Sequence, residues 1–164
     1  MKTINKDFRL WIVTEPVQLT AEFADKCLKV VLTEQKTLKA TLAKCYEGIN
    51  ADQFEDCKLK EEYMRLVFTC AMLLGTLIER QQYGEIGSNI KYEHTFADFK
   101  TAIDQIKFLI NQTGRVDYSG IKYSVCEVIF GGRVTDDKDR RLMHIITERL
   151  ISPDSIKQGH LFYP

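Results

Sequence analysis

Four charged side chains close to residue 135 could carry chemistry: Arg133, Asp136, Asp137 and Asp139. The three carboxylates could bind a cation, and the arginine could act as an arginine finger or as a sensor of bound phosphate. The acids lack the glycine and the closing glutamate of an EF-hand loop, however. Thr135 or Asp136 can instead cap a helix, and acids in the first turn of a helix interact favourably with the positive end of its dipole. We therefore interpret the acids as capping residues, and we expect Arg133 to serve the turn by pairing with an acid and reaching main-chain carbonyls.

Neither a nucleotide site nor a catalytic nucleophile is indicated. A phosphate-binding loop requires Gly-x-x-x-x-Gly-Lys-Ser/Thr after a strand. The nearest approximation, Gly84-Glu85-Ile86-Gly87-Ser88, has no lysine and follows a helical run, so we interpret it as a loop. Cys126 and His144 could form a nucleophilic dyad, but neither their spacing nor their flanking residues favour one. We expect no catalytic, nucleotide-binding or metal-binding residue in this chain, and no cofactor.

The composition excludes several classes of protein. Among 164 residues, Lys plus Arg and Asp plus Glu each number 23, so no net positive field favours nucleic acid. No apolar run approaches the ~20 residues that span a bilayer, so we expect no membrane partner and a cytosolic location. The cysteines are odd in number and include no Cys-x-x-Cys pair, which predicts free thiols at positions 27, 45, 57, 70 and 126.

The first 35 residues have the pattern of a short β-α-β segment. Phe8 to Thr14 is rich in aromatic and β-branched residues and is ended by Pro16, which predicts a strand. Thr20 can cap a helix over 21–27, and Leu28 to Leu32 predicts a second strand. Two strands are too few to close an α/β core, so their apolar side chains should be exposed.

From Thr37 onward the pattern is helical. Leu38, Leu42 and Tyr46 recur every four residues before Gly48, and a polar loop is expected over 50–56. The strongest periodic segment is 59–80, whose stripe from Tyr63 to Ile78 is widened by Met64, Phe68 and Met72. We expect this helix to be buried on more than one side.

Three further helices are predicted after this segment. Thr95-x-x-Asp98 is typical of a capping box ahead of a helix that Gly114 ends. Asp117 can cap the next helix, whose apolar face is Ile121, Val125, Val128 and Ile129. That helix stops at Gly131-Gly132, where glycine can adopt positive φ, and the last helix carries Leu142, Met143, Ile146 and Leu150. The tail from 152 to 164 is expected to be irregular.

Three ordered strings resemble the dynein heavy chain, in the C-terminal part of the sixth AAA+ module of its motor ring. The run from Phe130 to Asp137, Phe-Gly-Gly-Arg-Val-Thr-Asp-Asp, is followed by Asp139-Arg140-Arg141, as in that family. The stretch 79–93 resembles the family's Glu-Arg…Phe-Gly…Gly-Trp-Asn-Ile…Tyr-Glu pattern, with Ser88 in place of its tryptophan. Phe8-Arg9-Leu10-Trp11 with Glu15-Pro16 resembles the last core strand of the large subdomain. Lys138 replaces another tryptophan.

The resemblance implies a fold class and a domain division. The fold class is mainly α: a helical AAA+ lid-type bundle preceded by a short β-α-β remnant of an α/β AAA+ large subdomain. Residues 1–35 would be the end of that large subdomain, and residues 36–164 the helical small (lid) subdomain. The residues that carry the shared structural motif are Glu79, Arg80, Gly84, Gly87, Gly131, Gly132, Arg133, Thr135, Asp136 and Asp139.

The implied function is a structural and mechanical segment of an ATP-driven microtubule motor, non-catalytic by itself. ATP and Mg²⁺ would bind at other modules of the parent. The partners would be the rest of its own module and the adjacent modules, with microtubules reached only through the parent, in a cytoplasmic, cytoskeleton-associated or ciliary setting. Two alternatives remain: the lid of a working AAA+ ATPase that contributes an arginine to a nucleotide site, and a free-standing helical adaptor.

Overall fold

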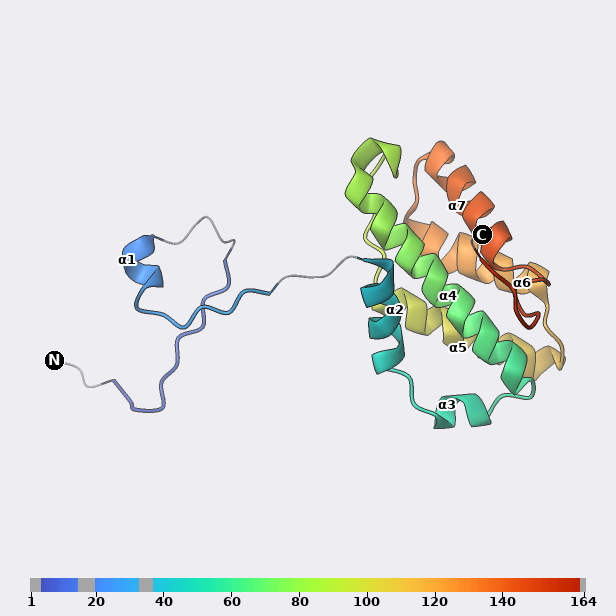
Figure 1. Cartoon of the computed structure of the whole chain (residues 1–164), viewed down its shortest axis with the longest axis horizontal. Helices are drawn as coiled ribbons and strands as arrows, with labels where there is room; N and C mark the ends of the chain where they lie inside the picture. The colour runs from blue at the N-terminus through green and yellow to red at the C-terminus, as the bar shows by residue number, and fades with distance from the viewer. Residues whose placement is uncertain (1–3, 15–19, 33–36, 163–164) are drawn as a thin grey trace. The chain divides into compact units, whose positions relative to one another are not determined.

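The computed structural model describes residues 4–14, 20–32 and 37–162. Contacts group the chain into two units, one within residues 1–34 and one within residues 35–164, and each is described by itself (Figure 1). The Glu15-Pro16 pair of the expected first strand and the predicted domain boundary at residues 35 and 36 lie outside the described residues.

The N-terminal unit contains one short helix, α1 (Ala21–Ala24), and the strand prediction is wrong for its described residues. Residues 8–14 and 28–32 adopt no strand, so the β-α-β remnant is not formed. A strand is stabilised by the ladder of hydrogen bonds to a neighbour and by a covered face, and β-propensity alone does not replace them. The prediction of exposed apolar side chains is confirmed: Trp11 is 86% and Leu32 91% exposed.

Two helices begin the second unit. Helix α2 (Leu38–Glu47) begins at Thr37, whose hydroxyl accepts from the amide of Ala40, and ends at Gly48 as predicted. The loop expected over 50–56 contains a one-turn helix instead, α3 (Asp52–Glu55). The loop was predicted from its polar composition, which gave no weight to Phe54. The ring of Phe54 packs 5.8 Å from the ring of Tyr63 and holds this turn against the core.

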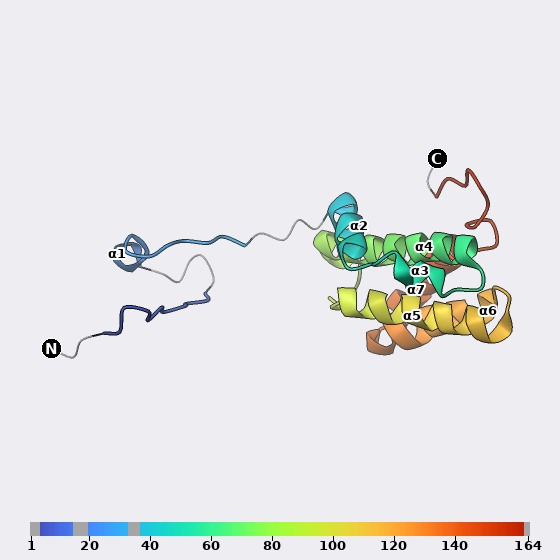
Figure 2. The ribbon, with the colours of Figure 1, turned by 90° about the horizontal axis from the view of Figure 1, so that it is seen from below.

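Helix α4 (Lys60–Arg80) is the centre of the bundle and confirms the long predicted helix. It packs against α2, α3, α5 and α7. In Figure 2, α4 lies in one layer, and α5 and α6 lie together in a second layer. Burial on more than one side is also confirmed, since Thr69 and Ala71 are buried as well as the predicted stripe, of which only Ile78 is partly exposed. The widened arc is only partly correct, because Met72 is buried whereas Met64 is 46% and Phe68 37% exposed.

Helix α5 (Phe96–Thr113) follows the predicted pattern closely. The hydroxyl of Thr95 accepts from the amide of Asp98, and the Asp98 carboxylate accepts from the amide of Thr95, which completes the capping box. Gly114 ends the helix in the left-handed region, with φ of 69°. The buried apolar face of α5 consists of Phe99, Ala102, Ile103, Ile106 and Ile110, and the helix packs on both α4 and η2.

The next helical run changes its pitch. Helix α6 (Tyr118–Lys122) continues directly into a π-helix, η2 (Tyr123–Phe130). Hydrogen bonds from i to i+5 widen the turn, so successive side chains are rotated by less than in an α-helix. Ile121 and Val125 are therefore buried as predicted, but Cys126 and Phe130 are buried too, and Val128 is 57% exposed. The prediction of Val128 in the apolar face is wrong because it assumed α-helical periodicity throughout.

The last turn and helix complete the bundle. The short 3₁₀ segment η3 (Gly131–Arg133) leads into α7 (Asp137–Leu150), which packs on α4 and η2. Positive φ was expected at the double glycine, but Gly131 has φ of −80°, so that reason is wrong. The irregular tail is confirmed up to residue 162. Within the described ranges, none of the helices has the length and apolarity that a bilayer crossing requires.

Candidate functional site

A network of polar side chains in the second unit surrounds the segment between α4 and α5. We call it the interhelix clamp and define it by Arg80, Asp98, Arg133, Asp136 and Asp139. These side chains come from α4, α5, η3 and the start of α7, and all of them bond to residues 87–95 or to the helix ends on either side.

The clamp begins at the end of α4. Nε and Nη2 of Arg80 donate to the carbonyl of Gly87 at 3.2 and 3.0 Å, so Arg80 holds the loop and does not pair with the adjacent Glu79, which is half-buried. Gly84 adopts φ of 57° in the 3₁₀ segment η1 (Gln81–Ile86). A Cβ on Gly87 would lie 1.8 Å from the carbonyl oxygen of Arg80, so only glycine permits this close approach.

Two aspartates at the start of α7 accept hydrogen bonds from main-chain amides. Asp136 is the N-cap, and its carboxylate accepts from the amides of Lys138 and Asp139 at 2.9 and 3.0 Å. The Asp139 carboxylate, 7% exposed, accepts from the amides of Asn89 and Ile90 at 2.9 and 3.1 Å. Hence the acids bind backbone N–H groups, as the capping interpretation predicted for Asp136. Asp139 binds a loop 50 residues away in sequence, which was not foreseen.

Arg133 forms a bidentate ion pair within the clamp. Its Nη1 and Nη2 reach the two oxygens of Asp98 at 2.6 and 2.7 Å, and Nη1 also donates to the carbonyl of Glu93 at 2.6 Å. Burial opposes ionisation of Asp98, but hydrogen bonds from Arg133 and Thr95 outweigh it and lower the pKa of the carboxyl. Asp98 therefore has two roles, as the capping box acid of α5 and as the partner of Arg133.

His94 lies inside the clamp between two rings. It packs 6.4 Å from the ring of Tyr92 and 5.8 Å from the ring of Phe130, and its buried Nδ1 has no hydrogen-bond partner. Burial lowers the pKa of His94 and Arg133 lowers it further, against the opposite effect of Asp98. His94 is thus held as a neutral imidazole that fills space.

The remaining predicted motif residues lie at the edge of this region. Thr135 is exposed between η3 and α7, and the cap is Asp136. Gly132 is exposed, and a Cβ there would meet nothing within 4 Å, whereas a Cβ on Gly131 would lie 2.1 Å from the carbonyl oxygen of Cys126. Sequence reasoning missed Gln81, which donates to the carbonyl of Tyr92, and found Asp98 only as a capping residue.

Cys126 and His144 do approach one another, but not as a nucleophilic dyad. Nε2 of His144 pairs with the Glu127 carboxylate, which competes with the Cys126 thiol for the imidazole. Burial raises the pKa of the Cys126 thiol, and the Thr147 hydroxyl opposes this only in part. A buried, protonated thiol is a poor nucleophile.

All five cysteines are free, as predicted. Cys27 is exposed and the other four are buried. Burial raises the pKa of Cys45 to about 11 and that of Cys70 to about 12, so both behave as small apolar groups of the core.

The clamp and the bundle together define a class of domain. Side chains that bind main-chain groups connect three elements to one interhelix loop. These elements are the central helix α4, its antiparallel partner α5 and the terminal hairpin of η2, η3 and α7. Such a site positions helices, and the class it defines is a helical lid-type bundle.

Comparison with known proteins identifies the family. The dynein heavy chain AAA lid domain matches residues 63–164. Human dynein axonemal heavy chain 1 is 30% identical over 160 residues, covering 97% of this chain and 4% of that protein. Human dynein axonemal heavy chain 8 is 31% identical over 95% of this chain, and the dynein-1-beta heavy chain of the flagellar inner arm I1 complex of Chlamydomonas reinhardtii is 27% identical over 99%. The chain belongs to the dynein heavy chain AAA lid family, and it spans about 4% of the length of these relatives.

Proposed function

We propose that this chain is the C-terminal part of the sixth AAA+ module of a dynein heavy-chain motor ring, with a structural and mechanical role and no catalytic residue of its own. The parent would be an ATP-driven microtubule motor that binds ATP and Mg²⁺ at other modules. The chain would contact the rest of its module and the adjacent modules, and would reach microtubules only through the parent.

The observation that carries this proposal is the engagement of Arg133. An arginine that senses nucleotide must offer its guanidinium to a phosphate. In this chain both terminal nitrogens of Arg133 are bound within the domain, to Asp98 and to the carbonyl of Glu93. This arrangement supports a role in which Arg133 makes α5 and the η3–α7 turn move as one body.

The relatives support a ciliary setting for the parent. The human axonemal heavy chains 1 and 8 and the I1 complex heavy chain of Chlamydomonas reinhardtii are axonemal or flagellar by name. We therefore propose that the parent motor works on the cytoskeleton of a cilium or flagellum, which is the ciliary option among the cytosolic and ciliary locations that the sequence left open.

Replacing Arg133 with alanine tests the mechanical role. We expect the free energy of unfolding to fall by about 1–3 kcal/mol, because Asp98 loses a charged partner while it stays largely buried. Thermal melts of the 164-residue chain measure this, with Arg141→Ala, an exposed arginine of α7, as the matched control. An unchanged melt together with impaired motor activity in the full heavy chain would favour the alternative, a lid that contributes an arginine to a nucleotide site.

Titration with nucleotide tests the absence of a catalytic role. We expect no saturable heat when Mg-ATP is added to the chain, because it contains no phosphate-binding loop and its motif acids bind backbone amides. Titrations with Mg²⁺ alone and with Mg-ADP serve as controls. Micromolar affinity for Mg-ATP would contradict the proposal and restore the working-ATPase alternative.

A further inference from the structure

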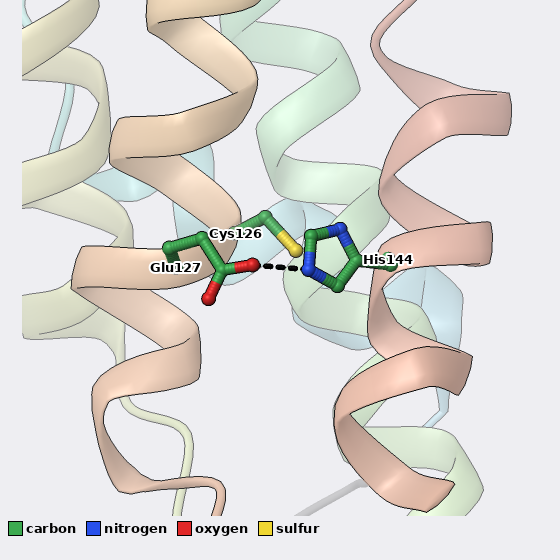
Figure 3. A group of neighbouring side chains, drawn as sticks. All are labelled: Cys126, Glu127 and His144. Carbon is green, nitrogen blue, oxygen red and sulfur yellow. Dashed lines mark ion pairs between the residues drawn. The ribbon is translucent and has the colours of Figure 1, made fainter. Parts of the chain in front are cut away.

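Three side chains of different chemistry converge between η2 and α7, outside the interhelix clamp. The thiol of Cys126, a carboxylate oxygen of Glu127 and a ring nitrogen of His144 all lie within 4.8 Å of one another. Figure 3 shows Cys126 and Glu127 on adjacent positions of one helix and the imidazole of His144 facing both of them from the neighbouring helix.

The π-helix explains why two consecutive residues share this face. In an α-helix, neighbouring side chains are turned well apart and do not face the same partner. The wider π turn reduces that rotation, so Cys126 and Glu127 both project toward α7. Segments of this kind occur frequently at functional sites.

The burial of the three side chains is graded from the core outward. Cys126 is 2% exposed, whereas the side chains of Glu127 and His144 are 32% and 48% exposed. An ion could therefore enter from solvent between Glu127 and His144 and reach a sulfur that lies at the inner end of the site.

We propose that Cys126, Glu127 and His144 bind one divalent cation of the Zn²⁺ class, which joins η2 to α7. Sulfur, imidazole nitrogen and carboxylate oxygen are the ligands that Zn²⁺ takes, in tetrahedral geometry at about 2.0–2.3 Å. Three protein ligands leave a fourth position for water. On binding, the Cys126 thiol and the Nε2–H of His144 each release a proton to solvent, so that the thiolate and the Nε2 lone pair bind the ion while Nδ1 keeps its proton.

A surface ion pair between Glu127 and His144 would account for two of the three residues, but not for the convergence of the thiol on the same point. The carboxylates of Glu127 and Glu148 are both close enough to Cys126 to act on it electrostatically, and their negative charge attracts a cation.

Titration of the metal-free chain with Zn²⁺ tests the site. The background should be Cys27→Ser, because Cys27 is the exposed cysteine and could bind metal adventitiously. We expect one equivalent to bind by calorimetry, and Co²⁺ to give a thiolate-to-metal charge-transfer band and a tetrahedral visible spectrum. Cys126→Ser and His144→Gln should each weaken Zn²⁺ binding by at least about tenfold, since even outer-shell partners contribute that much.

The controls separate this site from adventitious binding and from misfolding. His160→Gln, in the C-terminal tail, should leave affinity unchanged, and Zn²⁺ should raise the melting temperature of the background chain but not of the His144→Gln variant. If Cys126→Ser does not fold, His144→Gln decides the question, because His144 is half-exposed. Absence of a stoichiometric equivalent, absence of the Co²⁺ thiolate band, or equal affinity in the background chain and the His144→Gln variant would each overturn the proposal.

Discussion

Replacing Gly131 with alanine should destabilise the second unit strongly, by roughly 3 kcal/mol, whereas alanine at Gly132 should change stability little. The new Cβ at position 131 would lie 2.1 Å from the carbonyl oxygen of Cys126 and 2.9 Å from the end of Met143. Met143 can move aside, but the carbonyl belongs to the backbone of η2. The π-helix would have to shift, and with it the buried Phe130.

The neighbouring glycine is the matched control. Gly132 is exposed, and a Cβ there meets no atom within 4 Å, so the substitution adds no overlap. Urea denaturation of both variants measures the two free energies of unfolding on one scale. Equal effects at the two positions would mean that a general need for glycine in the turn, rather than close approach at Gly131, decides stability.

Replacing Asp139 with alanine should lower the free energy of unfolding by about 2 kcal/mol, because two backbone donors, the amides of Asn89 and Ile90, lose a charged acceptor. Asp139→Asn should lie between alanine and the native chain, since its single carbonyl oxygen can accept from only one of the amides at full strength. Thermal melts and amide hydrogen exchange at residues 89 and 90 provide the measurements.

Asp137→Ala provides the comparison for Asp139. Asp137 is in the same first turn of α7 but is exposed, so its loss removes only a favourable interaction with the helix dipole, worth less than about 1 kcal/mol. Fast exchange at residues 89 and 90 in Asp139→Ala but not in Asp137→Ala is expected. If both variants melt alike, the contact between Asp139 and the loop does not stabilise the fold.

Local signals in the sequence were sufficient for much of the bundle. The capping box of Thr95 and Asp98, the Asp136 cap and the long helix over 60–80 were predicted because each depends on residues within a few positions of one another. The Phe130–Asp137 string likewise located the turn and its arginine.

The remaining features depend on partners that are distant in sequence. Nothing near Arg133 indicates Asp98 as its acid, 35 residues away, because the choice is made by the packing of α5 against η2. The π-helix was missed because Val125, Val128 and Ile129 fit α-helical spacing equally well. The prediction of two strands was wrong because it used composition alone. Residues 8–14 and 28–32 have strand composition, but a strand also requires a neighbouring strand to pair with.

The length and continuity of α4 have a mechanical consequence. Its 21 residues make a rod of about 32 Å without a proline or a kink, and it packs on helices along its course. At one end Tyr63 packs against Phe54 of α3, and at the other end Arg80 donates hydrogen bonds to the carbonyl of Gly87 in the loop between α4 and α5. A load applied to either end therefore meets a stiff lever without an intervening joint, and it is delivered at the opposite end as displacement instead of being absorbed as bending.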